Sequence, residues 1–231
     1  MKQEEFVQEC KKLDISISEE MIQKLDKYAD LLKEWNEKMN LTAIVEKEEV
    51  YEKHFFDSVI ALDENVHAKV ADVGSGAGFP GLVWKIVKED LTIDLIEPTG
   101  KRCHFLNEVI QQLNLKNITV YNTRAEEHVK DHREEYDVVT ARAVANLRVL
   151  SELCVPLVKV NGTFLVMKGS HGKDEVSEAD QALKKLGVVL ENEKETPLPN
   201  GDPRQIFTFI KKEHTPNIYP RNYGQIKKKP L

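Results

Sequence analysis

The chain has 231 residues, of which 41% are apolar, and its 33 basic and 39 acidic side chains give a net charge of −6. This apolar content supplies a full hydrophobic core and excludes wholesale disorder. No apolar run reaches the roughly 20 residues that cross a bilayer, and the first residues lack the apolar segment of a secretory signal. The cysteines Cys10, Cys103 and Cys154 have neither disulfide-framework nor metal-ligand spacing. We therefore expect a soluble cytoplasmic protein without a metal and, lacking an apolar stripe that demands a partner, a monomer.

The charges are distributed unevenly along the chain. Residues 1–66 hold 9 basic and 17 acidic side chains, whereas no acidic side chain follows Glu213. The last residues carry Arg221 and the run Lys227, Lys228 and Lys229. The overall acidity argues against nucleic-acid binding by the whole surface, but it leaves room for a local basic site.

The elements predicted in chain order define the fold class. Apolar residues at helical spacing predict helices over 3–12, 18–39 and 47–61. Strands rich in Val and Ile then alternate with helices; the strands are expected at 69–73, 92–97, 118–122, 136–141, 162–167, 187–193 and 204–210, and the helices at 80–88, 101–114, 125–131, 146–158 and 174–186. This alternation predicts an α/β fold with a mainly parallel sheet, helices on both faces and an antiparallel last strand. We expect a helical cap (1–65), a central domain (66–213) and a basic tail (214–231).

The strongest motif is the glycine-rich turn after the first strand, which runs Asp72-Val73-Gly74-Ser75-Gly76-Ala77-Gly78-Phe79-Pro80-Gly81. Glycines permit a tight turn and close approach of a ligand to the backbone. Gly76, Gly78 and Gly81 also match the G-x-G-x-x-G spacing of dinucleotide-binding folds. That match alone leaves a dinucleotide and other nucleoside cofactors open.

The acidic residues around this turn favour S-adenosylmethionine over a dinucleotide. A pyrophosphate would be repelled by Asp72, whereas the ammonium and sulfonium cations of S-adenosylmethionine would be attracted. Glu97 ends the second strand, where an acid accepts hydrogen bonds from ribose hydroxyls. Ala125 and Glu126 follow the third strand, where the adenine lies in methyltransferases of this architecture. For Glu126, an ordinary acid in the first turn of a helix is an equally good interpretation.

Blocks along nearly the whole chain resemble the small-subunit ribosomal RNA guanine-N7 methyltransferases, also called RsmG or glucose-inhibited division protein B. The matching blocks are Asn40-Leu41-Thr42, His54-Phe55-Phe56-Asp57-Ser58, Asp72 to Gly81, Glu97-Pro98, Lys101-Arg102, Ala125-Glu126, Thr140 to Ala145, Lys168-Gly169 and Tyr219 to Leu231. One departure is Gln225-Ile226-Lys227, where many members have another proline. The resemblance implies a Rossmann-like class I methyltransferase sheet.

The resemblance also implies the reaction and part of the site. It implies methyl transfer from S-adenosylmethionine to N7 of one guanine, with cofactor contacts from Gly74, Phe79, Ala125, Glu126 and Arg142. The loop argument adds Asp72, Gly76, Gly78 and Glu97 to these candidates.

Guanine N7 carries a free lone pair, so we expect direct displacement with no general base, no catalytic triad, no metal and no nucleophilic cysteine. Arg142 and Lys168 are positioning candidates. Arg142 could hold the cofactor carboxylate or guanine O6, and its alternative is a structural salt bridge. Lys168 could touch the RNA backbone, and its alternative is a solvated side chain. His54 and Asp57 are interpreted as polar contacts that brace the cap against the site. Of the spaced pair His128 and His132, exposure to solvent is a better interpretation than metal binding.

The basic residues of the tail, Arg221, Lys227, Lys228 and Lys229, are candidates for contact with RNA phosphates. A solvated tail, or one packed on the domain through Ile218, Tyr219 and Tyr223, is the alternative. Three other functions stay open: a methyltransferase for another RNA such as transfer RNA, a dinucleotide-dependent oxidoreductase, and a non-catalytic ribosome-binding module. Whether ribosomal subunits or transfer RNA accept the methyl group separates the first of these alternatives from methylation of ribosomal RNA.

Overall fold

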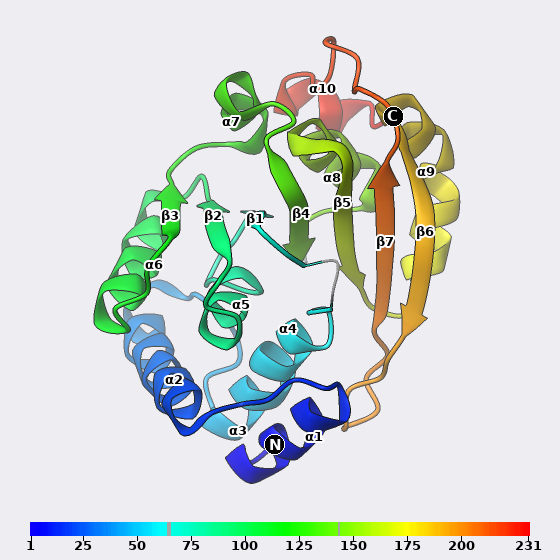
Figure 1. Cartoon of the computed structure of the whole chain (residues 1–231). Helices are drawn as coiled ribbons and strands as arrows, with labels where there is room; N and C mark the ends of the chain where they lie inside the picture. Colours follow the sequence, from blue (N-terminus) through cyan, green and yellow to red (C-terminus); the bar gives the residue numbers. More distant parts are fainter. Residues whose placement is uncertain (64–65, 143) are drawn as a thin grey trace.

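The computed structural model describes residues 1–63, 66–142 and 144–231. Its centre is a seven-stranded sheet in the order β3-β2-β1-β4-β5-β7-β6 (Figure 1). The strands are β1 (Lys69–Val73), β2 (Thr92–Ile96), β3 (Ile118–Tyr121), β4 (Tyr136–Arg142), β5 (Val158–Lys168), β6 (Val188–Glu195) and β7 (Gln205–Lys211). Strands β1 to β5 pair in parallel, and β7 inserts antiparallel between β5 and β6. The predicted fold class, with its antiparallel last strand, is confirmed.

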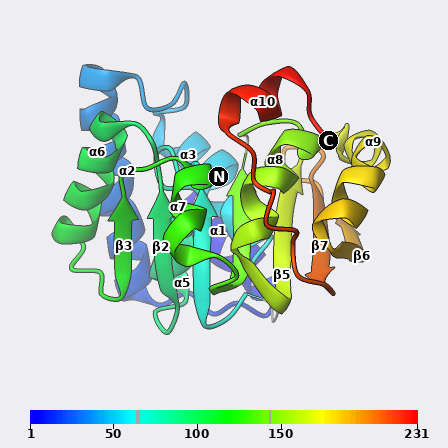
Figure 2. The same ribbon diagram turned by 90° about the horizontal axis from the view of Figure 1, so that it is seen from above.

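Helices cover both faces of this sheet. The cap helices are α1 (Gln3–Lys12), α2 (Glu19–Met39), α3 (Lys47–Val50) and α4 (Asp57–Val59), blue to cyan in Figure 1. The later helices are α5 (Gly81–Val87), α6 (Gly100–Gln112), α7 (Ala125–His132), α8 (Leu147–Cys154), α9 (Gly172–Leu186) and α10 (Tyr223–Lys228). The view from above shows α7 and α8 in front of the strands and the blue helix α2 behind them (Figure 2).

Alternation along the strands divides the core between the two faces. Val70 and Val138 join one apolar cluster with α1 to α6, and their neighbours Ala71 and Val139 join a second cluster with α7 to α10. The cap therefore shares a continuous core with one face of the sheet. Its division from residues 66–213 as a separate unit stays a prediction.

Helix ends follow ordinary capping chemistry. The Oγ atom of Ser18 accepts from the backbone N–H of Met21 at 3.2 Å, which starts α2. Helix α2 ends at Met39, and its C-cap Asn40 has a φ of 48°, in the left-handed region that asparagine tolerates. No helix of the described residues is long and apolar enough to cross a membrane.

The structure departs from the predicted elements in three places. The predicted helix 47–61 ends at residue 59, and its middle, Tyr51–Phe56, is a π-helix, a form that often marks functional sites. Strand β5 starts at Val158, four residues earlier than predicted, because a 3₁₀ turn at Val155–Leu157 ends α8. The tail forms α10, with Asn222 as its N-cap, where no helix was predicted.

Candidate functional site

The turn between β1 and α5 needs its glycines. Gly74, Gly76 and Gly78 have φ values of 71°, 59° and 97°, a region that other residues rarely adopt. A Cβ on Gly78 would lie 2.3 Å from Leu82 Cδ1 and 2.7 Å from the hydroxyl of Tyr28. That hydroxyl donates to the Ala77 carbonyl, so the cap helix α2 holds the turn from outside. The turn is therefore a fixed loop at the carboxyl end of β1.

Asp72 lies fully buried beneath this loop. Its Oδ2 atom accepts from the Gly81 backbone N–H at 3.0 Å. Its Oδ1 atom and the hydroxyl of Thr140, its register partner on β4, have no hydrogen-bond partner within the described part of the chain. Burial raises the pKa of Asp72 to about 7, against the Gly81 hydrogen bond and the charge of Arg142, which lower it. A buried carboxylate with an unsatisfied oxygen favours a cationic partner.

Glu97 ties the glycine loop to the next strand. Its two carboxylate oxygens accept from the backbone N–H groups of Gly76 at 2.9 Å and Thr99 at 2.8 Å. Its carbonyl accepts from the Asn122 amide at 3.1 Å, which connects the ends of β2 and β3. Ala125 then begins α7.

The strand order places the predicted cofactor residues in one line. Along the edge formed by the carboxyl ends of β3, β2, β1 and β4, the line runs from Ala125 and Glu126, past Glu97 and the glycine loop, to Arg142. Ligands of open α/β sheets bind at this edge. The structure thus brings these residues to one edge, while their contacts with a cofactor stay predictions.

Arg142 connects the sheet to the cap. Its guanidinium donates to Asp57 Oδ2 at 3.2 Å and contacts His54 twice, at the carbonyl (3.4 Å) and at Nδ1 (3.3 Å). It also lies 4.9 Å from the ring centroid of Phe79, a cation–π contact. Phe79 itself is buried among aromatic rings, with Tyr28 stacked at 5.5 Å. The predicted bracing of the site by His54 and Asp57 is confirmed by these contacts.

His54 is held as a neutral imidazole. Burial, and then the charge of Arg142, lowers the pKa of His54 to about 3. A guanidinium can only donate, so Nδ1 of His54 is an acceptor, and the proton resides on Nε2. Nε2 then donates to Thr42 Oγ1 at 2.9 Å. The imidazole is a fixed support for Arg142.

Arg204 is a site residue that the sequence reasoning missed. It precedes β7, and its Nε atom donates to Asp57 Oδ1 at 2.8 Å, across a separation of 147 residues. Asp57 is therefore shared by two arginines. No local pattern around Arg204 distinguishes it from a surface arginine, so only the tertiary structure reveals this contact.

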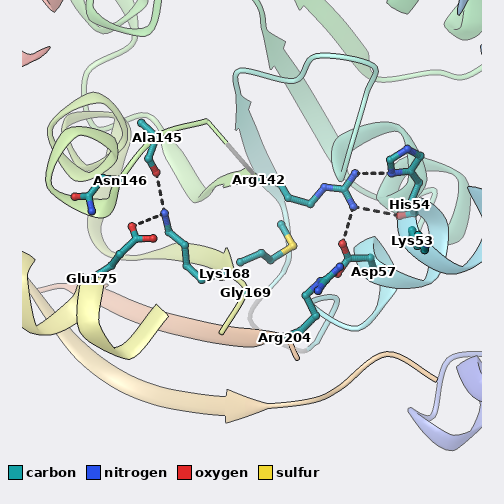
Figure 3. Close-up of a pocket in the computed structure, with 11 residues that line it drawn as sticks. Lys53, His54, Asp57, Arg142, Ala145, Asn146, Lys168, Gly169, Glu175 and Arg204 are labelled. Carbon is teal, nitrogen blue, oxygen red and sulfur yellow. Dashed lines mark hydrogen bonds and ion pairs between the residues drawn. The ribbon is translucent and has the colours of Figure 1, made fainter. Parts of the chain in front are cut away.

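A cavity of about 590 Å³ opens beside these residues, next to the ends of β4 and β5. Figure 3 shows the labelled lining residues as two groups, and Met167 lines the cavity as well. One group is Lys53, His54, Asp57, Arg142 and Arg204, and the other is Ala145, Asn146, Lys168, Gly169 and Glu175.

Lys168 lines this cavity but is not solvated. Its ammonium donates to the Ala145 carbonyl and to Glu175 Oε2, both at 2.8 Å. The same Glu175 oxygen accepts from the Leu147 backbone N–H at 2.7 Å. The solvated-lysine interpretation is therefore wrong, because the side chain joins β5 to α8 and α9.

The C-terminal tail is packed on the domain. Arg221 donates from Nε (2.8 Å) and a terminal nitrogen (2.6 Å) to the carboxylate of the fully buried Glu152. Ile226 is buried in the second core cluster with Tyr219 against it, whereas Ile218 is 72% exposed. The packed alternative is thus correct for Tyr219 and wrong for Ile218, and Arg221 anchors the tail from inside.

The tail nevertheless lies beside the site edge. Arg124, the N-cap of α7, lies over the ring of Tyr223 at 5.1 Å, and Arg148 in the first turn of α8 donates to the Pro230 and Leu231 carbonyls. Both helices begin at the carboxyl edge of the sheet. Lys227, Lys228 and Lys229 are exposed, and within the described residues their side chains have no ion pair or hydrogen bond.

The histidine pair of α7 is not the exposed pair that was predicted. His128 is buried, its Nε2 atom lies 2.7 Å from the Tyr136 hydroxyl, and its ring stacks on His132 at 4.1 Å. Burial lowers the pKa of His128 to about 4. Within residues 1–63, 66–142 and 144–231, no group of three or more His, Cys, Asp or Glu side chains is arranged to hold a metal ion.

The strand order, the glycine loop and the acids at successive strand ends define a class I S-adenosylmethionine-dependent methyltransferase fold. Solved structures agree with this fold. A precorrin-6y C5,15-methyltransferase from Geobacter metallireducens matches with a TM-score of 0.53 and 15% identity, over 73% of this chain and 90% of that one. M. jannaschii TYW2, solved in complex with AdoMet, matches with a TM-score of 0.54 and 15% identity, over 67% and 74% of the two chains.

Sequence relatives identify the family. Residues 21–199 match the GidB family, described as rRNA small subunit methyltransferase G. A Streptococcus pneumoniae protein named ribosomal RNA small subunit methyltransferase G is 44% identical over 237 aligned positions that cover 100% of both chains. A Clostridium perfringens protein of the same name is 44% identical over 228 positions, 96% of this chain and 95% of that one. The chain belongs to the rRNA small subunit methyltransferase G family, as its motifs predict.

Proposed function

We propose that this protein transfers a methyl group from S-adenosylmethionine to N7 of a specific guanine in small-subunit ribosomal RNA, in the cytoplasm and as a monomer. The observation that carries the proposal is the arrangement at the carboxyl edge of the sheet. There the acid-flanked glycine loop at the ends of β1 and β2 adjoins an arginine-lined cavity at the ends of β4 and β5. Membership of the family supports the same reaction.

The residues of the loop fit the cofactor. Asp72 Oδ1 and the Thr140 hydroxyl are buried polar atoms without partners among the described residues, and they would be satisfied by the cationic part of S-adenosylmethionine, directly or through water. Gly74, Gly76 and Gly78 offer a bare backbone, and each Glu97 oxygen retains acceptor capacity for ribose hydroxyls. Ala125 and Glu126 lie where the adenine would end. The ring of Phe79 supports Arg142, so the backbone of Phe79 is the part that would contact the cofactor.

The methyl transfer requires the protein to position the cofactor and the guanine, and it requires no acid–base group. When bound, S-adenosylmethionine supplies a methyl group on a positively charged sulfur. The N7 lone pair of guanine takes that methyl without losing a proton, so no residue has to act as a general base. The neutral His54 and the paired Arg142 suit this role, because they hold partners in place and exchange no proton near neutral pH. Arg142 would bind the cofactor carboxylate or the guanine and is the main positioning residue.

The surface beside the site supplies a contact for RNA. We assign Lys227, Lys228 and Lys229 to RNA phosphates, because they are exposed and, among the described residues, unpaired, and lie on a tail that packs over the starts of α7 and α8. Elsewhere the acidic surface repels RNA, so a local cluster of cations sets where it can approach. Arg221 supports this surface by anchoring the tail, and its own contact with RNA stays a prediction.

Methyl acceptance tests the proposal. Small ribosomal subunits, their naked RNA and transfer RNA are incubated with the protein and cofactor labelled in the methyl group, and the RNA is digested to nucleosides. We expect label in 7-methylguanosine from the small-subunit substrates and none from transfer RNA. The Arg142→Ala variant should lose activity while remaining folded. Label in transfer RNA alone, or in another nucleoside, contradicts the assignment.

A further inference from the structure

The Lys168–Glu175 group of the cavity presents one donor and one acceptor that have no partner in the part of the chain that the structure describes. An ammonium has three N–H donors, and Lys168 uses two of them in hydrogen bonds to the Ala145 carbonyl and to Glu175 Oε2. Oε2 of Glu175 accepts from Lys168 and from the Leu147 N–H, while Oε1 has no hydrogen-bond partner within the described residues. Both side chains line the cavity (Figure 3).

A guanine that reacts at N7 must leave its helix. In an RNA helix N7 lies in a deep, narrow groove that side chains cannot reach, so the protein has to take an unpaired or extruded base. The cavity of about 590 Å³ falls in the usual size range of small-ligand pockets. It lies at the ends of β4 and β5, so it adjoins the predicted cofactor residues at Arg142 and extends past them along the sheet edge.

We infer that Glu175 and Lys168 select the target base by its Watson–Crick edge. Glu175 Oε1 accepts from N1–H and the 2-amino group of guanine, and the free N–H of Lys168 donates to O6. Adenine presents the opposite pattern, an acceptor at N1 and an amino group at C6, so it would meet a carboxylate and an ammonium with the wrong polarity. This inference rests on the proposed function, because it explains how the same site chooses guanine.

Lys168 and Glu175 are assigned to the Watson–Crick edge because the reaction requires that N7, on the other edge of the base, stays free. The commonest arginine contact with guanine is a fork on O6 and N7, which would block the reacting atom. Reading the opposite edge keeps N7 free. Of the two arginines, Arg142 faces the loop residue Phe79 and Arg204 is held by Asp57, so this group suits anionic parts of the ligands. The arginine group of the cavity thus suits anionic parts of the ligands, whereas the Lys168–Glu175 group suits the edge of the base.

Inosine tests the inference, because it keeps O6, N1–H and N7 but lacks the 2-amino group. Small subunits are reconstituted from RNA that carries guanosine or inosine at the methylated position. The ratio of kcat/KM for the two substrates is measured for the wild type, for Glu175→Gln and for Glu178→Gln. Glu178 is the matched control, since it lies on the same helix α9 and is exposed. The ratio is internal to each protein, so a partly unfolded preparation does not change it.

We expect the wild type and Glu178→Gln to prefer guanosine by about 10- to 100-fold, the effect of one hydrogen bond to a charged group. Glu175→Gln should reduce the preference to within about threefold. A wild-type ratio near one overturns the inference without reference to any variant, as does an unchanged ratio in Glu175→Gln. Failure of the wild type to methylate the guanosine subunits at all would instead contradict the proposed function.

Discussion

The two halves of the site edge satisfy their charges in different ways. At the ends of β1 and β2, the carboxylates accept from backbone N–H groups of the glycine loop: Asp72 bonds to Gly81, and Glu97 bonds to Gly76. At the ends of β4 and β5, charged side chains also pair with one another, as in the Asp57–Arg204 and Lys168–Glu175 pairs. The tail combines both patterns, because the carboxylate of Glu152 accepts from the backbone N–H and from the guanidinium of Arg221.

This difference decides what a substitution does. A backbone donor persists when side chains change, so Asp72→Asn keeps an acceptor for the Gly81 N–H. Glu97→Gln, in contrast, would place an amide NH2 against one of the two backbone N–H groups that Glu97 binds. A charge paired only with another side chain becomes an uncompensated buried charge when its partner is removed. Loss of the cation from a buried pair should therefore cost stability, whereas removal of the Asp72 charge in the loop half should weaken ligand binding without such a cost.

The largest expected effect is on stability, in the tail. Arg221→Ala leaves Glu152 buried without its cation, which should lower the free energy of unfolding by about 3 kcal/mol. Denaturant titration of the ligand-free protein measures this change. A second substitution, Glu152→Gln, should recover most of the loss, because the uncompensated charge is then absent.

Lys228→Ala is the control for this experiment, since Lys228 is exposed and unpaired within the described residues. It should alter stability by less than about 0.5 kcal/mol. If Arg221→Ala keeps full stability and instead raises the KM for ribosomal subunits, Arg221 contacts RNA rather than anchoring the tail.

The next effect concerns Asp72, where stability and binding should move in opposite directions. Asp72→Asn keeps an acceptor for the Gly81 N–H but removes the buried charge. Loss of its charge-assisted contact should weaken S-adenosylmethionine binding by about tenfold or more, measured by calorimetry. The ligand-free variant should be more stable than the wild type at pH 8, by on the order of a few kcal/mol.

The sign follows from the raised pKa of Asp72, which moves from 3.8 to about 7 because the carboxyl is buried. The folded state binds the proton more tightly than the unfolded state, so the wild type loses stability as the pH rises from about 4 to about 7. The Asp72→Asn substitution removes this dependence, and the two proteins should converge near pH 4. Equal affinity for the cofactor in both proteins would exclude Asp72 from its site.

The same contrast explains how much could be predicted from the sequence. The glycine loop and Glu97 follow from local rules, because a strand, a turn and a helix fix where their backbone lies. The roles of Arg204, Glu175 and Arg221 could not be predicted, since their partners lie 147, 7 and 69 residues away on elements whose contacts only the fold defines. The π-helix of Tyr51–Phe56, which positions His54, also has the apolar spacing of an ordinary helix.

A smaller effect is expected at His54, which connects the two halves through Arg142 and Phe79. Because burial and Arg142 lower the pKa of His54 to about 3, the imidazole stays neutral in the working range. Turnover at saturating substrates should be flat across roughly pH 6.5–9. His54→Ala should lower turnover by about tenfold, through misplacement of Arg142, without adding a pH dependence. If turnover of the wild type rises steeply with pH, and turnover of His54→Ala does not change with pH, then His54 acts as a general base.

The smallest expected effect on the protein itself is at the three lysines of the tail, which unlike Arg221 have no internal partner among the described residues. Replacing Lys227, Lys228 and Lys229 together by glutamine should leave the free energy of unfolding and the cofactor affinity unchanged. The KM for ribosomal subunits should rise, and the log–log slope of its salt dependence should flatten by about 2 to 3, because fewer counterions are released when phosphate contacts are lost. The matched control is the triple replacement of Lys11, Lys116 and Lys185 by glutamine, which removes the same charge from exposed positions elsewhere. If both triple variants shift the slope equally, only the net charge matters; a shift confined to the tail variant places the RNA beside α10, and no shift in either leaves the tail lysines solvated during catalysis.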